Sequence, residues 1–264
     1  MITASIVVYN SPVAQLRKAV ECILRARIGH LWIVYNGPDE NSCLYDSIPG
    51  TTFLKVENRG FGAGHNEAIA RAAQSGSDYH LVMNADIWWN GDVITPLAEL
   101  MDSDREIALA APEVRYPDGR LQYSCRMLPT PFNLFARRFL PERAISRMDN
   151  RYLLKDLDHT APINAPYLIG CFMMLRMSVL EQTGAFDERY FMYPEDIDLT
   201  RRLHSRWKTL YLPDQTIVHE HQQESKKNLR MLRIHLVNMI RYFNKWGWFF
   251  DSERRRFNRQ LRKH

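Results

Sequence analysis

The first third of the chain alternates short apolar runs with stretches in which apolar residues recur every three or four positions. Each apolar run is closed by a polar or glycine-containing turn, which is typical of buried strands. We therefore predict strands at residues 2–9, 30–35, 52–56 and 79–87. A helix capped by Ser11, with Pro12 at its first position, follows the first strand, and a second helix precedes the fourth. This order predicts an α/β fold with a mostly parallel sheet.

The pattern is looser after residue 111. Residues 116–119 predict a hairpin turn. Further elements are expected at 132–139, 143–154, 167–175, 178–183, 209–212, 215–218 and 229–250. Ser178 opens a predicted capping box, and Pro194 is well placed to start another helix. The arginines of this region either meet a phosphate beside an acceptor or are solvated; they are Arg126, Arg137 and Arg138.

With 264 residues, of which 45% are hydrophobic and 25% charged, the chain has a globular composition and can bury a sizeable core. No apolar run approaches the roughly 20 residues that span a bilayer. The N-terminus shows no secretory signal. The four cysteines lack the spacing of zinc ligands, so we expect free thiols in a reducing cytoplasm.

Positive charge is concentrated at the C-terminal end. Residues 226–264 hold twelve Lys or Arg against Asp251 and Glu253, a local net charge of +10, so the rest of the chain is close to −5 within the total of +5. The same segment carries a cluster of aromatic residues between Tyr242 and Phe250. Basic and aromatic residues together suit an anionic membrane surface. Core packing by the aromatics and binding of nucleic acid are the alternative interpretations.

Acidic side chains stand at two places where predicted elements end or begin. Asn84 and Asp86 close the fourth strand, and ligands collect at the carboxyl ends of strands in open α/β sheets. Glu195, Asp196 and Asp198 fall in the first turn of a later predicted helix. Acids stabilise a helix N-terminus, but three acids in four positions also repel one another, and capping needs only one. We therefore expect at least one of these three acids to have a chemical role.

Histidines and glycines supply two further candidates. Along an extended chain His219 and His221 point to the same side, and imidazole joins oxygen ligands around divalent ions such as manganese. The glycine-rich segment 59–66 follows the third strand with the spacing G-x-G-x-G, so it is not a dinucleotide fingerprint, and the chain has no Walker A loop. Its backbone either approaches a phosphate at a helix N-terminus or forms a turn without a ligand.

Four segments in this order resemble the nucleotide-binding half of family 2 inverting glycosyltransferases with the GT-A fold: Ser5–Asn10, Trp32–Gly37, Glu57–Asn66 and Met83–Asp86. The resemblance covers about residues 2–225. It implies a Rossmann-like sheet with helices on both faces, and a nucleotide held by Val8, Tyr9, Asn10, Asn36, Asn58, Gly60, Gly62, Asn66 and Asn84. Tyr35 stands where many relatives have an acid that reads the base, and Asn84 replaces the first acid of the metal motif.

The resemblance also implies the chemical roles. Asp196 is the expected base, with Glu195 as its nearest substitute and Asp198 as a structural residue. Asp86, which also contacts the nucleotide, and His219 are expected to bind Mg²⁺ or Mn²⁺, and Lys226 would neutralise the leaving diphosphate. We expect a 1–225 catalytic domain, with a nucleotide-sugar half at 1–111 and an acceptor half at 112–225, followed by a basic helical tail at 226–264.

These expectations define an inverting glycosyltransferase of bacterial surface polysaccharide synthesis, such as that of O-antigen lipopolysaccharide. The preferred donor is dTDP-rhamnose and the acceptor a glycan or polyprenyl-linked sugar; UDP-dependent transfer of galactofuranose or a hexose is the alternative. We expect a cytoplasmic protein, peripheral on the inner face of the cell membrane, whose tail binds anionic lipid and not nucleic acid. A sugar-nucleotide pyrophosphorylase would need a basic glycine-rich loop after the first strand, which is absent. A non-catalytic membrane scaffold would need no acids.

Overall fold

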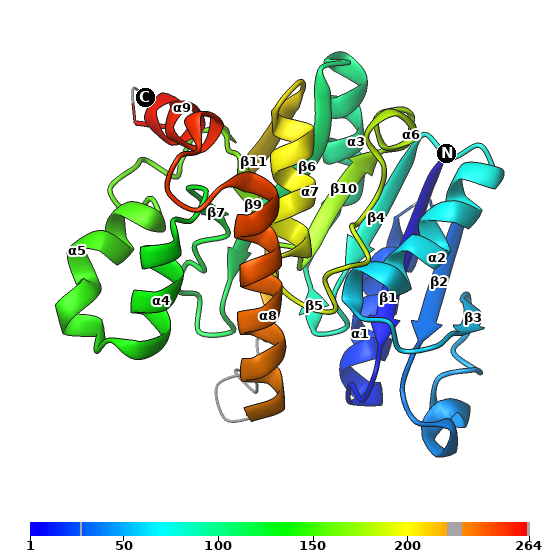
Figure 1. The fold of residues 1–264 in the computed structure, drawn as a ribbon. Coiled ribbons are helices and arrows are strands. Elements are labelled where there is room, and N and C mark those ends of the chain that lie inside the picture. Colours follow the sequence, from blue (N-terminus) through cyan, green and yellow to red (C-terminus); the bar gives the residue numbers. More distant parts are fainter. Residues whose placement is uncertain (27, 221–228, 263–264) are drawn as a thin grey trace.

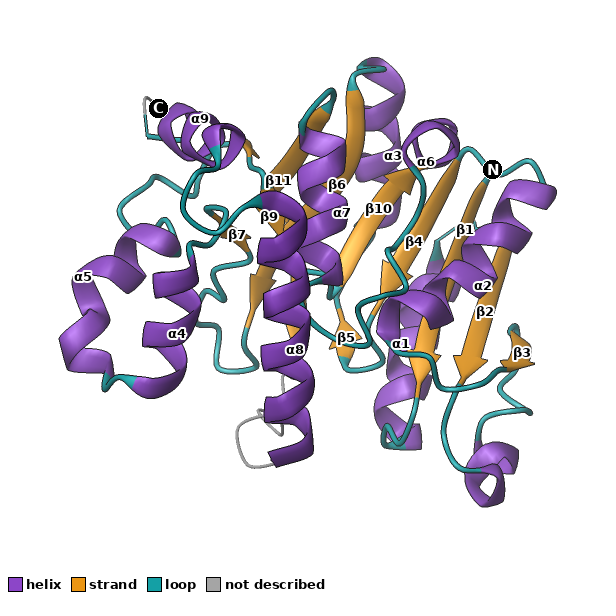
Figure 2. Ribbon diagram, in the orientation of Figure 1, coloured by secondary structure: helices purple, strands orange, loops and turns teal. Residues whose placement is uncertain are grey.

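The computed structural model describes residues 1–26, 28–220 and 229–262. Within them a central sheet has the strand order β3-β2-β1-β4-β10-β6-β11-β5, with β8 paired to β11 (Figure 1). The strands of this sheet are β1 (Ile2–Val8), β2 (His30–Tyr35), β3 (Thr52–Lys55), β4 (Tyr79–Met83), β5 (Ile87–Trp88), β6 (Ile107–Arg115), β8 (Ile163–Asn164), β10 (Phe172–Arg176) and β11 (Lys208–His219). Helices cover both faces of the sheet (Figure 2).

The first half follows the predicted order of strands and helices. β1 to β4 are parallel to one another, with α1 (Val13–Arg25) and α2 (Phe61–Gln74) between them and a short 3₁₀ helix, η1 (Asp39–Leu44), before β3. The predicted cap on the first helix is wrong. α1 begins after Pro12 without a side-chain cap, and the carbonyl of Ser11 instead accepts a 2.8 Å hydrogen bond from the Tyr45 hydroxyl.

The second half interrupts the parallel order. β10 is antiparallel to both β4 and β6, whereas β6 and β11 are parallel. The single strand predicted at 167–175 is divided into β9 (Tyr167–Leu168), which pairs with β7 (Cys125–Arg126) in a separate sheet, and β10. Between the two strands the Gly170 amide donates to Oδ2 of Asp196 at 2.9 Å.

The short helix that follows is α6 (Met177–Thr183), and its predicted capping box is also wrong. It begins one residue before Ser178 and has no side-chain cap. The predicted 116–119 turn is present, closed by a 2.9 Å bond from the Gly119 amide to the Tyr116 carbonyl. The two expected strand pieces near 213–214 form one strand, β11, whose register shifts between Leu212 and Thr216.

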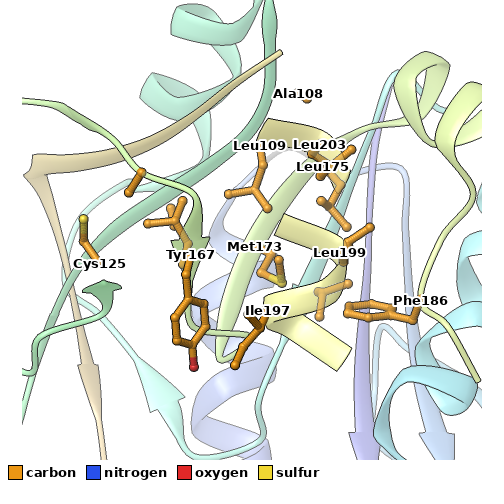
Figure 3. Close-up of a cluster of buried hydrophobic side chains, with 14 of the residues drawn as sticks. Ala108, Leu109, Cys125, Tyr167, Met173, Leu175, Phe186, Ile197, Leu199 and Leu203 are labelled. Atoms are coloured by element: carbon orange, nitrogen blue, oxygen red, sulfur yellow. The ribbon is translucent and has the colours of Figure 1, made fainter. Parts of the chain in front are cut away.

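The core lies on both faces of the sheet. On one face α7 (Glu195–His204) places Ile197, Leu199 and Leu203 against the sheet residues Leu109, Met173 and Leu175 (Figure 3). On the other, α1 and α3 (Ile94–Ser103) cover a second buried cluster. Each fully buried aliphatic side chain contributes roughly 1.5–3 kcal/mol, so the two clusters fix the sheet that carries the candidate site.

The C-terminal helices pack on this body. α8 (Leu229–Trp246) buries Tyr242 and Phe243 against the α7 side of the core, and α9 (Ser252–Gln260) follows. Beside these helices lie α4 (Pro131–Phe139) and α5 (Glu142–Tyr152), close to their predicted ranges (Figure 1). The expected domain boundary at 225 falls outside the described residues. None of the helices that the structure describes is both long and apolar enough to cross a membrane.

Candidate active site

The carboxyl ends of three parallel strands meet at one edge of the sheet. Val8 of β1 lies beside Tyr35 of β2, and Ile6 lies beside Met83 of β4. The residues that follow these strands therefore share this edge, including Asn36 and Asn84. In open α/β folds this edge is where ligands bind.

Asp86 and His219, which are far apart in sequence, come together here. β5 pairs antiparallel with the end of β11, which sets His219 opposite Ile87, and the Glu220 amide donates to the Asp86 carbonyl at 3.0 Å. As a result the Nε2 atom of His219 lies 3.3 Å from Oδ1 of Asp86. His221 and Lys226 lie outside the described residues.

Gln122 orients the histidine, and no sequence pattern marked it. Its side-chain Oε1 lies 2.9 Å from Nδ1 of His219, and its backbone N–H donates to the Val114 carbonyl at 2.8 Å. An amide oxygen only accepts, so Nδ1 carries the proton and Nε2 is turned toward Asp86. Burial lowers the pKa of His219, but Cys171 and Asp86 raise it more strongly, to about 10, so without a metal ion Nε2 also carries a proton, which a bound cation would have to displace.

The pair fits a divalent ion that is held partly by substrate. A carboxylate and an oriented imidazole are suitable ligands for Mn²⁺ or Mg²⁺. Across residues 1–26, 28–220 and 229–262, no group of three or more His, Cys, Asp or Glu side chains could hold a metal. Ions of this kind commonly take the remaining ligands from water and substrate phosphates, so two protein ligands suffice.

The second acidic site stands at the start of α7. Oδ2 of Asp196 accepts from the Gly170 amide at 2.9 Å, and Oδ1 accepts from the Ile197 amide at 2.8 Å. The Asn84 amide donates to the Cys171 carbonyl at 2.9 Å. Because Gly170 and Cys171 are adjacent, this short stretch of backbone ties the strand end at Asn84 to Asp196.

Burial raises the pKa of both neighbouring acids, but their other contacts differ. Glu195 is buried, and its burial together with the charge of Asp196 raises its pKa to about 8. Burial also raises the pKa of Asp196, but the amides of Gly170 and Ile197 and the charge of Arg126 oppose that rise. The two backbone amides favour the ionised form of Asp196, which is the form a general base requires.

The neighbours of these acids have structural roles. Asp198 is fully buried and accepts from Arg202 at 2.9 Å, Lys245 at 2.9 Å and Trp246 at 2.7 Å, which agrees with its expected role. The Nε atom of Arg126 donates to the Tyr123 carbonyl at 2.8 Å, and its guanidinium carbon lies 5.7 Å from the Tyr167 ring centre.

Packing within the chain requires glycine at two positions of the glycine-rich segment 59–66. A Cβ on Gly60 would lie 2.0 Å from the Phe191 carbonyl oxygen, and one on Gly62 would lie 2.8 Å from Cβ of Phe186. The Asn66 side chain donates to the Phe186 carbonyl and accepts from its amide, at 2.9 and 3.0 Å. Contact of this segment with a nucleotide stays a prediction.

The residues expected around the nucleoside differ in exposure. Tyr9 and Asn10 are exposed, the Val8 side chain is buried in the core, and Asn36 and Asn58 lie 3.4 Å apart through their amide groups. Tyr35 is fully buried and donates to the Pro38 carbonyl at 2.6 Å. Tyr35 thus holds the turn after β2 through its hydroxyl group.

An α/β sheet with a carboxylate–imidazole pair at its ligand-binding edge and a second carboxylate nearby defines a GT-A-type protein, as the sequence predicted. The family model for glycosyl transferase family 2 matches residues 3–184, and the chain belongs to this family. It is 28% identical over 175 residues to an N-acetylglucosaminyl-diphospho-decaprenol L-rhamnosyltransferase of Mycobacterium tuberculosis, covering 61% of this chain and 56% of that protein. The chain therefore matches little more than half the length of that relative.

It is also 26% identical over 203 residues to the rhamnosyltransferase WbbL of Escherichia coli, covering 73% of each chain. Among solved structures, GalNAc-T7 with UDP, GalNAc and Mn²⁺ has a TM-score of 0.65 at 14% identity, covering 93% of this chain and 48% of that one. The mannosyltransferase PcManGT of Pyrobaculum calidifontis, with GDP-Man and Mn²⁺, has a TM-score of 0.55 at 15% identity, covering 91% and 64%. At these identities the likeness confirms the GT-A fold.

Proposed function

We propose that the protein is an inverting rhamnosyltransferase that uses dTDP-rhamnose and a lipid-linked sugar acceptor at the cytoplasmic face of the membrane. The observation that supports the reaction is the Asp196 carboxylate, which is held by two backbone amides beside the buried Glu195. The names of two relatives support rhamnose, and one of them names a diphospho-decaprenol acceptor. A UDP-linked donor is the alternative, favoured by the structural likeness to a protein solved with UDP.

In the proposed mechanism Asp196 accepts the proton of the acceptor hydroxyl as its oxygen attacks the anomeric carbon. The bond to the donor diphosphate breaks in the same in-line step, so the configuration inverts and no covalent enzyme intermediate forms. Asp86 and His219 would hold Mg²⁺ or Mn²⁺, which supplies charge stabilisation to the leaving diphosphate. Gln122 keeps His219 in the tautomer that can bind the ion.

The test replaces the base. Asp196→Asn keeps the acceptor atom for the Gly170 amide but cannot take a proton, so we expect transfer to fall by roughly 10²–10⁴-fold. Binding of dTDP-rhamnose with Mn²⁺, followed by thermal shift, is expected to stay within about twofold, since the base contributes to the chemical step and not to donor binding. Glu181→Gln, an exposed acid of α6, is the matched control.

Each outcome is informative. Undiminished transfer by Asp196→Asn would remove the base assignment. Transfer from UDP-sugars but not from dTDP-rhamnose would move the donor to the alternative while leaving the mechanism intact. No transfer from any nucleotide sugar by the wild-type chain, with both acceptor classes supplied, would overturn the proposed function.

A further inference from the structure

Phenylalanine side chains stand exposed at the turn between α8 and α9 and on α4. Phe250 is 90% exposed and Phe249 71%, while Phe132 and Phe135 on α4 are 61% and 58% exposed. Single exposed apolar residues are common, but neighbouring ones usually mark an interaction surface. A phenylalanine ring has no polar atom, so it loses nothing when it enters hydrocarbon.

A groove joins these elements into one surface. It has a volume of about 620 Å³ and lies between α4, α5, the turn and α9. Its apolar lining includes Phe132, Met148 and Phe249, and its basic lining includes Arg151, Arg255 and Arg259. Aromatic and cationic groups therefore alternate around a single depression; we call the face made by Phe249, Phe250, Arg255, Arg259 and Arg262 the aromatic–basic surface.

The charge of this surface is not neutralised within the chain. Both acids of the region are engaged elsewhere: Asp251 and Glu253 bind Arg201 at 2.7 and 3.0 Å. Arg255 donates to the Phe249 carbonyl at 3.2 Å, which ties the basic helix to the aromatic turn. In the part of the chain that the structure describes, Arg255, Arg259 and Arg262 form no ion pair with a carboxylate. The surface therefore presents positive charge to a partner.

Within the tail that the sequence favoured for lipid binding, two cations of α8 have partners inside the chain. Arg241 donates to the Arg189 carbonyl at 2.5 Å, and Lys245 lies 3.0 Å from Asp187 and 2.7 Å from Asp198. These two cations thus fasten α8 to the rest of the chain. Arg233 of α8 is exposed as well, but the cations that lie beside the exposed rings, Arg255, Arg259 and Arg262, stand one helix further on.

We propose that the aromatic–basic surface docks the protein on anionic phospholipid, with Phe249 and Phe250 entering the interface and Arg255, Arg259 and Arg262 contacting headgroup phosphates. Apolar rings on a protruding turn flanked by arginines match both layers of a lipid surface, its hydrocarbon boundary and its negative charge. A nucleic acid would also complement the charge, and its bases could stack on the rings, so RNA is the competing partner that the experiment has to separate from lipid. The inference goes beyond the proposed reaction and does not depend on it.

The experiment measures co-sedimentation of the full chain with vesicles, without any sugar nucleotide. We expect binding to phosphatidylglycerol–phosphatidylcholine vesicles at least roughly tenfold stronger than to phosphatidylcholine alone, and weaker in high salt. Phe249→Ser with Phe250→Ser, and separately Arg255→Glu with Arg259→Glu, should each lower the partition coefficient about tenfold or more. All four side chains are exposed, so folding is expected to be retained.

Matched controls come from the opposite end of the fold. Leu24→Ser with Leu44→Ser removes two exposed leucines, and Arg17→Glu with Arg25→Glu reverses two exposed arginines of α1. Neither control should change vesicle binding. A blue shift of tryptophan fluorescence on adding vesicles, expected because Trp248 adjoins the turn, gives a second readout. Equal loss in controls and test variants, binding unaffected by the test variants, or binding to RNA or a second copy in place of vesicles would overturn the proposal.

Discussion

Gly170 is the residue that gives Asp196 its place. An added Cβ would lie 3.0 Å from Cβ of Asp196, which is tighter than an ordinary contact, and 3.5 Å from its Oδ2, which is an ordinary one. Gly170→Ala should therefore displace the carboxylate and lower kcat by about tenfold to a hundredfold, with little change in melting temperature.

Gly76 is the converse control for this substitution. It has a φ of +68° and open space around its missing side chain. Gly76→Ala should cost about 1 kcal/mol of stability through backbone strain and leave kcat unchanged. Steady-state kinetics and thermal unfolding of both variants give the comparison, and an unchanged kcat in Gly170→Ala would contradict the role assigned to the close approach.

Gln122 should act on metal affinity. Replacing it by Leu removes the acceptor that fixes the His219 tautomer, so we expect the apparent Kd for Mn²⁺ to rise about 10–100-fold. Gln122→Glu keeps an acceptor at the same position and should retain tight binding. Titration of Mn²⁺ in the presence of dTDP, by calorimetry, measures this directly. Equal affinity in the Leu and Glu variants would show that orientation of the imidazole is not limiting.

At the scale of residues, sequence could identify groups that stand in regular patterns. Asp86, Asp196 and His219 follow strand ends or open a helix, so their types and positions drew attention. Gln122 lies in a loop 97 residues before the histidine that it orients, and a lone glutamine carries no periodic or charge pattern. Gly170 was expected to allow close backbone approach, but only the folded chain shows that its neighbour is Asp196.

At the scale of elements, one buried ion pair fastens α9 to α7. Arg201, which is 1% exposed, donates to both oxygens of Asp251 at 2.8 and 2.7 Å, and its guanidinium carbon lies 4.1 Å from the Trp246 ring centre. Asp251→Ala should destabilise the protein by about 3 kcal/mol, because among the described residues the buried guanidinium then keeps only Glu253 as an acidic partner.

Two further variants serve as comparisons for Asp251→Ala. Removing both partners, in Arg201→Met with Asp251→Ala, should cost less than the single Asp251 change, since no charge is left buried. Asp118→Ala breaks an exposed pair with Arg120 and should cost under about 1 kcal/mol. Urea unfolding measures all three variants. A single change at Asp251 that costs no more than the one at Asp118 would contradict the role of the pair.

The elements that sequence predicted best are those defined by local periodicity. The parallel β1–β4 half and the helices α4, α5 and α7 appear close to their expected ranges. The misplaced elements depend on distant partners. The 167–175 run is apolar throughout, so nothing local indicates that Tyr167 and Leu168 pair with β7 while Phe172–Arg176 joins β4 and β6.

At the scale of the whole molecule, the tail aromatics divide between two environments that share one composition. Tyr242 and Phe243 are 0% and 2% exposed, whereas Phe249 and Phe250 face outward. Sequence left core packing and lipid contact as alternative interpretations of the same cluster. Helical periodicity could not separate them, because the turn after Trp246 changes which side of the chain faces the core.

Buried histidines should make the stability of the whole fold depend on pH. The Ser5 hydroxyl, on β1, forms hydrogen bonds with His65 at 2.7 Å and His80 at 2.8 Å, and all three side chains are fully buried. Burial lowers the pKa of His80 to about 3 and, with the neighbouring His80, lowers that of His65 well below 6.5. Burial and Arg256 lower the pKa of His204 to about 4.

These shifts set the sign of the dependence. Below pH 6.5 the unfolded chain protonates all three histidines while the native fold keeps them neutral, so their contribution to stability is full above about pH 6.5 and is lost as pH drops toward 4.5. His219, whose pKa is raised, acts in the opposite direction only above pH 6.5. Glu195 acts in the opposite direction, because its pKa is about 8 in the native fold and near 4.5 in the unfolded chain. Between these pH values the native fold therefore holds one extra proton, which offsets about one of the three histidine protons. A net difference near two protons corresponds to roughly 3 kcal/mol per pH unit.

Urea unfolding from pH 7 to 5 measures this slope. His80→Gln, which can still bond Thr3 and Ser5, should reduce it by about 1.4 kcal/mol per pH unit. A slope that His80→Gln leaves unchanged would mean that this imidazole is protonated inside the fold.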